Sequence, residues 1–421
     1  MNKDSVTMAI PEPLSRPVMK DLLRIPVLVA ALGYMVDMYD LFLFSIIRVP
    51  SLKSLGLSGG SIMKEGIVLL NLQMAGMLIG GIVWGIMGDK RGRLSVLFGS
   101  IFIYSLANLG NGLVTSVGAY AVLRFIAGFG LAGELGAGMT LVSEILPARI
   151  RGYGATLVAT TGVMGALLAY LVSFFFNWRI AFFIGGGLGL LLMILRIRVF
   201  ESGIFMKLKQ VNVKRGDVRM LFNNKARLLK YINGIVIGMP IWFAVGILIT
   251  FSPEFGQALG LVQPIDAGKS VMLFFAGQLA GNFVSGFISQ RLQSRKKALL
   301  LFILCSTSFA VVYLMVPFHS SIVFYTICMC LGFCSGYWTL FIAVATELFG
   351  SNLRATVATT IPNFVRATVI PLSFLFGITK SFAGTIYGAL IVGLMVYIAA
   401  VIALFNLEET FKKDMNYNEG E

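Results

Sequence analysis

The sequence predicts an all-α integral membrane protein of twelve transmembrane helices in two six-helix halves. Of its 421 residues, 57% are hydrophobic and only 13% are charged, whereas soluble domains carry about 25% charged residues. Mean hydropathy is +0.87. The apolar residues gather in long stretches bounded by charged or turn residues, without the alternating pattern of a membrane β-barrel. These observations favour a helical membrane fold.

Twelve apolar spans of membrane-crossing length follow one another along the chain. Between the sixth and the seventh lies a polar segment, and ten basic residues fall between Arg196 and Lys230. We therefore expect a segment 1–24, a first half 25–198, a linker 199–230, a second half 231–406 and a tail 407–421. The expected spans are 25–49, 66–87, 94–113, 117–146, 152–175, 178–198, 231–252, 268–290, 298–317, 320–349, 355–379 and 383–406.

The distribution of basic residues predicts the orientation. With both termini inside, cytoplasmic segments hold 26 of the 34 Lys and Arg residues, external segments six, including Arg48, and spans two. The positive-inside rule then gives cytoplasmic termini, in a multi-pass protein of the inner membrane. The basic residues alternate with apolar spans, so the net charge of +15 predicts no nucleic-acid partner.

The two halves carry a similar segment after their fourth span. SEILPARIRGYGAT at 143–156 aligns with TELFGSNLRATVAT at 346–359, which matches Glu144 with Glu347 and Arg151 with Arg354. A six-plus-six repeat is typical of secondary transporters, which hold a solute between halves that rock against each other.

Five charged residues lie well inside apolar spans: Asp37, Asp40, Arg124, Glu134 and Arg366. A charge near the bilayer centre costs roughly 2.5–3.5 kcal/mol on insertion scales, so these side chains should face a shared aqueous cavity or one another. We predict a solute site there. The alternative is that one or more of these ion pairs only hold helices together.

Roles follow from the chemistry of the side chains. Arg366 offers a planar fork of donors and is the expected anion anchor, with Asn363 on the same face. Asp37 or Glu134 is the expected proton-coupling carboxylate. Arg124 would pair with Asp40 or Asp37, or guide anions inward. Further solute-binding candidates are Tyr34, Asp40, Trp242, Gln278, Asn282, Tyr337 and Trp338, for several of which packing or interhelical hydrogen bonding is the alternative.

The segment Gly85-Ile-Met-Gly-Asp89-Lys-Arg91-Gly-Arg93 resembles the loop signature G-x-x-x-D-[RK]-x-G-R of the major facilitator superfamily. Arg124-x-x-x-Gly128-x-Gly130 resembles a second motif of that family. The resemblance implies two six-helix halves related by pseudo-two-fold symmetry and a cytoplasmic charge cluster that latches one alternating state. Its second-half copy has Gln290 in place of the aspartate. The latch residues would be Gly85, Asp89, Arg91, Arg93, Glu144, Arg151, Glu347 and Arg354.

Within the superfamily, Asp37-x-Tyr39-Asp40-Leu-Phe looks like the first-helix pattern of the phosphate:proton and organic-anion or metabolite:proton symporters. Departures around Glu134 and Arg366 favour a solute other than phosphate. We therefore expect proton-coupled import of a small organic anion or zwitterion by a monomer in the lipid bilayer. Export of a metabolite or drug is the nearest alternative, followed by a sensor or a membrane enzyme. No cofactor is expected, and the four cysteines, with no histidine near them, predict no metal site.

Overall fold

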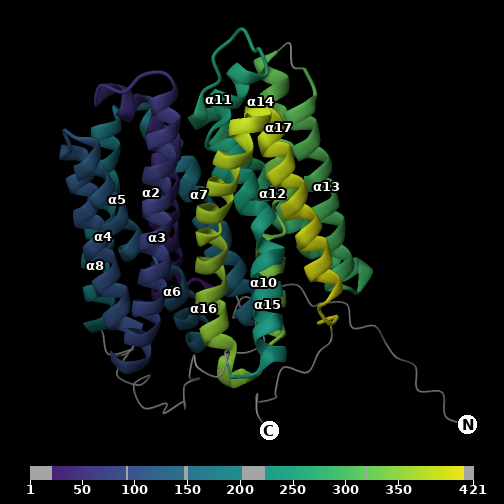
Figure 1. Cartoon of the computed structure of the whole chain (residues 1–421). Helices are drawn as coiled ribbons and strands as arrows, with labels where there is room; N and C mark the ends of the chain where they lie inside the picture. Colours follow the sequence, from purple (N-terminus) through teal and green to yellow (C-terminus); the bar gives the residue numbers. More distant parts are fainter. Residues whose placement is uncertain (1–20, 92, 147–149, 202–222, 318–319, 412–421) are drawn as a thin grey trace, which may run out of the picture.

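The computed structural model describes residues 21–91, 93–146, 150–201, 223–317 and 320–411, and over these residues the chain is helical. The helices run side by side in one bundle, with the purple and blue helices of the first half next to the green and yellow helices of the second (Figure 1). Lys230 near the start of α10 (Lys225–Phe243) pairs at 3.2 Å with Glu408, just after α17 (Val369–Phe405). We call this end of the bundle the terminal end.

The first half contains the six predicted spans, with one of them divided in two. The first helix, of thirty residues, has Pro26 near its start, where a missing N–H is tolerated. The helices are α2 (Ile25–Ser54), α3 (Gly60–Arg91), α4 (Arg93–Leu113), α5 (Val117–Leu131), α6 (Glu134–Ile145), α7 (Arg151–Phe175) and α8 (Trp178–Glu201).

The second half repeats this order with additional short segments. After α10 the chain forms a π-helical segment, η3, in which the Thr250 amide donates to the Val245 carbonyl five residues back. The elements after α10 are η3 (Ala244–Ile249), α11 (Ser252–Ala258), α12 (Ala267–Leu292), α13 (Arg295–Met315), α14 (Ser321–Cys334), α15 (Trp338–Glu347), α16 (Ser351–Ala367) and α17.

The fourth and tenth predicted spans are each broken near the middle. Between α5 and α6 the chain turns at Ala132 and Gly133, and between α14 and α15 it turns at residues 335–337. Gly133 packs against Ser100 of α4, and Gly336 packs against the backbone of Gly281 on α12. A side chain at either glycine would meet atoms of the neighbouring helices, so both breaks lie where a neighbouring helix approaches closely.

The last two predicted spans, 355–379 and 383–406, are separated close to the expected position, and the first of them has an additional turn. The chain turns at Thr368, between α16 and α17, and again inside α17 at Gly384, where φ is 77°. Pro371 has no N–H to donate to the Ala367 carbonyl, which explains the first turn. A positive φ is accessible to glycine, which explains the second.

The same packing order occurs in both halves. In the first half α3 packs on α5 and α4 on α8, and in the second α12 packs on α14 and α13 on α17. The halves meet where α12 contacts α2 and α7, and where α16 contacts α3 and α6. This repeat confirms the predicted twelve-helix architecture.

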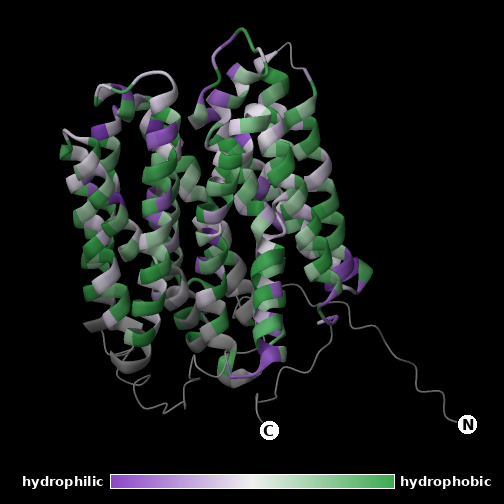
Figure 2. Ribbon diagram, viewed as in Figure 1, coloured by the Kyte–Doolittle hydropathy of each residue, from purple (hydrophilic) through white to green (hydrophobic). Residues whose placement is uncertain are grey.

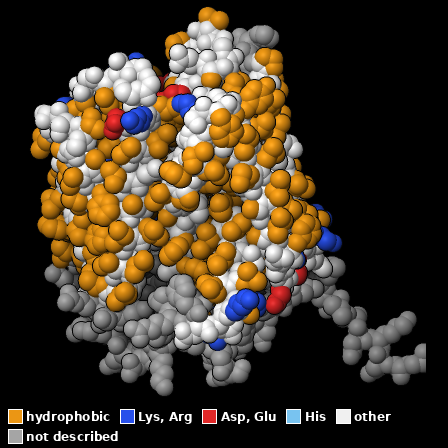
Figure 3. All heavy atoms as spheres, in the orientation of Figure 1, with side chains coloured by type: hydrophobic (Ala, Val, Ile, Leu, Met, Phe, Trp, Pro, Cys, Tyr) orange, Lys and Arg blue, Asp and Glu red, His pale blue; other side chains and the backbone are white. Residues whose placement is uncertain are grey.

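The outside of the bundle is apolar over most of its height. Hydrophobic residues dominate the ribbons and the visible surface, and charged side chains appear near the two ends (Figures 2 and 3). Among the described residues, 10 helices are long and apolar enough to cross a membrane, and Val117–Leu131 is a shorter apolar helix. Side chains such as Leu113, Phe175 and Phe374 are about 70% exposed, which suits contact with lipid.

Candidate functional site

A buried ion pair joins the two halves. Arg366 on α16 lies with Nη2 3.7 Å from Oδ2 of Asp37 on α2. Both side chains are almost completely buried. A charge at this depth is expensive unless it is compensated, so each of these two residues supplies the compensation that the other needs. Both residues are predicted site residues, and the structure brings them together.

A pocket opens beside this pair, between the halves. The space in it that a water molecule could occupy is about 20 Å³, room for about one water, so the two halves are packed closely around it. Its polar lining groups are few, and aromatic and aliphatic side chains form the rest. The lining residues are Tyr34, Met38, Phe42, Val163, Ile241, Trp242, Val245, Phe274, Phe275, Gln278, Trp338 and Arg366.

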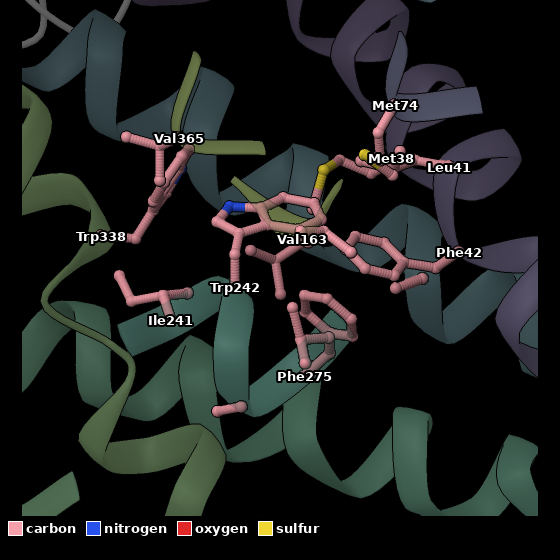
Figure 4. Close-up of a cluster of buried hydrophobic side chains, with 14 of the residues drawn as sticks. Met38, Leu41, Phe42, Met74, Val163, Ile241, Trp242, Phe275, Trp338 and Val365 are labelled. Carbon is pink, nitrogen blue, oxygen red and sulfur yellow. The ribbon is translucent and has the colours of Figure 1, made fainter. Parts of the chain in front are cut away.

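Aromatic side chains from both halves form one wall. Phe42 of α2 stacks on Trp242 of α10, with ring centroids 5.9 Å apart and planes at 20°. Phe42 also contacts Phe275 of α12, at 4.3 Å between centroids. Figure 4 shows these rings turned toward one another, with Trp338 across from them. An apolar wall with a guanidinium at one side suits a planar molecule that carries an acidic group.

Five of the predicted solute-binding residues line this pocket, namely Tyr34, Trp242, Gln278, Trp338 and Arg366. The structure places four others behind the lining. None of the four is among the lining residues, and their binding of a solute stays a prediction. These four are Asp40, Asn282, Tyr337 and Asn363.

Hydrogen bonds explain where three of these four side chains lie. Asn363 Nδ2 donates to the Ala132 carbonyl at 3.1 Å, which links α16 to the break in the fourth span. The Tyr337 hydroxyl donates to the Ile237 carbonyl, also at 3.1 Å. Asn282 accepts a bond of 3.4 Å from the Thr339 hydroxyl.

Asp40 is buried inside the first half. Its carboxylate lies against α8, where Gly185 has no side chain and so leaves room for it. Asn108 on α4 and Arg124 on α5 are its polar neighbours there. Asp37 and Asp40 are therefore on one helix but face different surroundings, the interface between the halves and the interior of one half.

Glu134 has a partner outside the set of predicted site residues. Arg196 of α8 donates from Nη1 to Oε1 at 2.9 Å and from Nη2 to Oε2 at 2.7 Å. The Ser100 hydroxyl donates to Oε1 at 2.8 Å, and both charged side chains are buried. Arg196 was counted among the basic residues flanking the linker, although it lies within the predicted span 178–198.

Arg124 is held inside the first half, on α5. It donates to the side-chain carbonyl of Gln73 on α3, and its guanidinium lies 4.7 Å from the centroid of the Phe44 ring. These contacts tie α5 to α2 and α3. Arg124 does not line the pocket.

A second ion pair between the halves was not predicted. Arg48 of α2, counted as external, is fully buried, and its Nη1 and Nη2 each lie 2.7 Å from an oxygen of Glu254 on α11. Its place inside the span 25–49 was the available signal. The partner was not predictable, because Glu254 lies more than two hundred residues further along the chain.

The predicted latch falls largely on side chains outside the described residues: those of Asp89, Arg91, Arg93, Glu144, Arg151 and Arg354. Gly85 lies in α3. Glu347 pairs with Arg295 at 3.1 Å and accepts a bond of 2.6 Å from the Thr410 hydroxyl. Within the described part of the chain, no group of three or more His, Cys, Asp or Glu side chains could hold a metal ion.

This arrangement, two similar half-bundles with a compensated charge pair and a small pocket between them, defines the class of secondary transporters rather than enzymes. A profile of the Major Facilitator Superfamily matches residues 30–367. The chain belongs to this superfamily.

Individual relatives are transporters. The chain is 27% identical over 341 residues to a probable 4-methylmuconolactone transporter of Cupriavidus pinatubonensis, covering 77% of this chain and 76% of that one. It is 26% identical over 284 residues to the 3-(3-hydroxyphenyl)propionate transporter of Escherichia coli, covering 62% and 66%. The crystal structure of a D-xylose–proton symporter superposes with a TM-score of 0.68 at 17% identity, over 92% of this chain and 98% of that one. This structural likeness confirms the fold.

Proposed function

We propose that this protein is a proton-coupled symporter that imports a small organic anion across a bacterial inner membrane, with both termini in the cytoplasm. Residues 25–198 and 231–406 would rock against each other, connected by the linker 199–230. The observation that carries the proposal is the Asp37–Arg366 pair at 3.7 Å between the halves, beside a pocket with an aromatic wall.

The coupling follows from charge balance. Arg366 can compensate one negative charge in this buried place. When the carboxylate of a solute binds Arg366, an ionised Asp37 would leave one negative charge without compensation, so solute binding favours protonation of Asp37. Solute and proton then cross together, and both are released where the proton concentration is low. Glu134 is the second candidate for this role, although its tight pair with Arg196 favours Asp37.

The pocket supports a solute with a ring. Phe42, Trp242 and Trp338 offer flat apolar surfaces, and Gln278 adds an amide for a second polar group. Two relatives are named for carrying a methylated muconolactone and a hydroxyphenylpropionate. We propose a monocarboxylate built on an aromatic or unsaturated ring as the solute class.

Uptake into proteoliposomes tests the proposal. Radiolabelled benzoate, nicotinate and 3-hydroxyphenylpropionate would be compared with acetate and phosphate, with and without an inward proton gradient. We expect gradient-dependent accumulation of a ring-bearing acid, and its loss in Arg366→Ala.

Arg179→Ala is the matched control, because this arginine donates to the carbonyls of Gly112 and Val114 within its own half. If Arg366→Ala accumulates the acid at the parent rate, Arg366 does not anchor the anion. Efflux of preloaded acid on proton entry, without uptake, would show an exporter.

A further inference from the structure

A further ion pair joins the halves at the end of the bundle away from the terminal end. Arg48, near the end of α2, is fully buried. Its guanidinium binds both carboxylate oxygens of Glu254, which is partly exposed, at 2.7 Å each. The second half thus contacts α2 through an ion pair in which Arg48 is buried and Glu254 is in contact with solvent.

Other groups fix the arginine in this position. The guanidinium stacks 4.5 Å from the centroid of the Phe251 ring, and Nη2 donates to the Thr250 carbonyl at 3.3 Å. The Thr250 hydroxyl donates to the Ser45 hydroxyl at 3.0 Å. Arg48 and Ser45 belong to the first half and their partners to the second, so all these contacts would break together if the halves separated here.

The segment that carries these partners begins at the pocket. Trp242 and Val245 line the pocket, and η3 (Ala244–Ile249) connects them to Thr250. Irregular π-helical turns are stabilised less well than α-helix and occur frequently at functional sites. A change of packing around Trp242 can therefore reach the Arg48 partners through a short and deformable stretch of chain.

We propose that Arg48 and Glu254 form a gate that closes the pocket on the outer side, and that breaking this pair opens the pocket outward. The inference rests on the proposed alternating access and orientation. Because Arg48 is buried, removal of Glu254 leaves its charge without compensation in the closed state. The closed state is then disfavoured relative to an open state in which water reaches Arg48.

Cysteine labelling from outside tests the gate without any solute or proton gradient. Val245→Cys would be introduced after replacement of Cys305, Cys328, Cys330 and Cys334 by alanine, and its reaction with a membrane-impermeant maleimide would be timed in intact cells. We expect Glu254→Gln and Arg48→Gln each to raise the labelling rate about tenfold, within the range that interaction energies of contacting pairs produce. Arg179→Gln, which removes an arginine that contacts its own half, should leave the rate unchanged.

A double-mutant cycle separates pairing from general loosening. If the two residues act as one gate, Arg48→Gln/Glu254→Gln labels no faster than the faster single variant. The gate would be contradicted if the two substitutions multiplied each other's effect on the labelling rate, or if Glu254→Gln left the labelling rate unchanged. Faster labelling only from the inner side, in inverted vesicles, would also contradict it.

The outcomes for gate and transport are distinguishable. If the gate variants are labelled faster from outside and the protein takes up none of the tested acids, the gate is supported and the proposed solute class is contradicted. Normal uptake with unchanged labelling in both single variants would contradict the gate alone.

Discussion

Two buried carboxylates of the first half differ in how completely they are paired. Glu134 receives two short bonds from Arg196 and a third from Ser100. Among the described residues, Asp37 has one ion pair, at 3.7 Å with Arg366 across the interface, and its oxygens accept no hydrogen bond. A carboxylate held by three donors within one rigid half suits a structural role, whereas one that faces a movable half can change its partner and its protonation state.

Replacement of Asp37 by asparagine should uncouple transport. Asp37→Asn keeps a side chain of similar shape but cannot bind and release a proton, so we expect accumulation driven by a proton gradient to fall at least tenfold. Exchange of internal for external solute, which needs no net proton movement, should persist. The measurement is uptake and counterflow in proteoliposomes, and gradient-driven accumulation at the parent level would assign the proton to another carboxylate.

Replacement of Glu134 should mainly lower stability. Glu134→Gln leaves the buried Arg196 without a counter-charge, a loss of about 3–5 kcal/mol in comparable cases. We expect a melting temperature several degrees lower in detergent.

The matched control for this prediction is Glu408→Gln. Glu408 pairs with Lys230 but is largely exposed, so its loss should have little effect. A Glu134→Gln protein that melts like the parent and loses proton dependence would make Glu134 the coupling group.

At the scale of elements, the break between α14 and α15 brings Trp338 to the pocket. Side chains of α12 hold this break. The Ser285 hydroxyl donates to the Gly336 carbonyl at 2.8 Å, and the Gln278 amide donates to the Ser335 carbonyl at 3.4 Å. The break leaves these carbonyls without a donor in their own helix. Side chains of α12 supply the donors instead, because buried backbone groups need hydrogen-bond partners.

Removal of one of these bonds should loosen the break. Ser285→Ala leaves the Gly336 carbonyl without this donor, at a cost of about 1–3 kcal/mol. We expect a lower melting temperature and faster amide exchange at residues 335–338. Ser308→Ala is the control, because Ser308 is exposed and bonds within its own helix. Equal melting temperatures for both variants would contradict the assigned role of Ser285.

A similar contact fixes the segment directly after α17. Glu409 accepts bonds from the Ser294 hydroxyl and from the amides of Arg295 and Lys296, at the start of α13. Burial raises the pKa of Glu409 and these hydrogen bonds lower it, and the net shift is downward. Its contribution to docking is therefore present at neutral pH and is lost as the pH falls below the ordinary range of a glutamate.

The whole molecule has a predicted orientation that follows from its charge distribution. Val262, in the loop after α11, is 96% exposed, and Asn406 lies at the terminal end, directly after α17. If the positive-inside rule holds for this chain, these positions lie on opposite sides of the membrane.

Labelling at the two ends checks this orientation. In the background without native cysteines, Val262→Cys should react with an impermeant maleimide in intact cells. Asn406→Cys should react only after the cells are permeabilised. The reverse pattern would invert the topology, and with it the direction assigned to the gate.

The sequence by itself determined the fold class, the family and the charged residues placed in the membrane. Long apolar spans can satisfy their backbone only as helices, so composition and spacing were sufficient for the architecture. Asp37 and Arg366 stood out because a charge inside an apolar span is rare and costly. Tyr34, Trp242, Gln278 and Trp338, predicted as solute-binding candidates, line the pocket, and their binding of a solute stays a prediction.

Only the tertiary structure decided which charges meet and which polar residues face the pocket. Arg196 and Arg48 lie near the ends of apolar spans, where a side chain can equally reach solvent. Only packing of the helices shows that both are buried and paired with Glu134 and Glu254. Tyr337 and Trp338 are adjacent in sequence, yet one bonds a neighbouring helix and the other lines the pocket. Spacing fixes the face of a helix on which a residue lies, whereas the neighbours of that face depend on contacts between segments far apart in the chain.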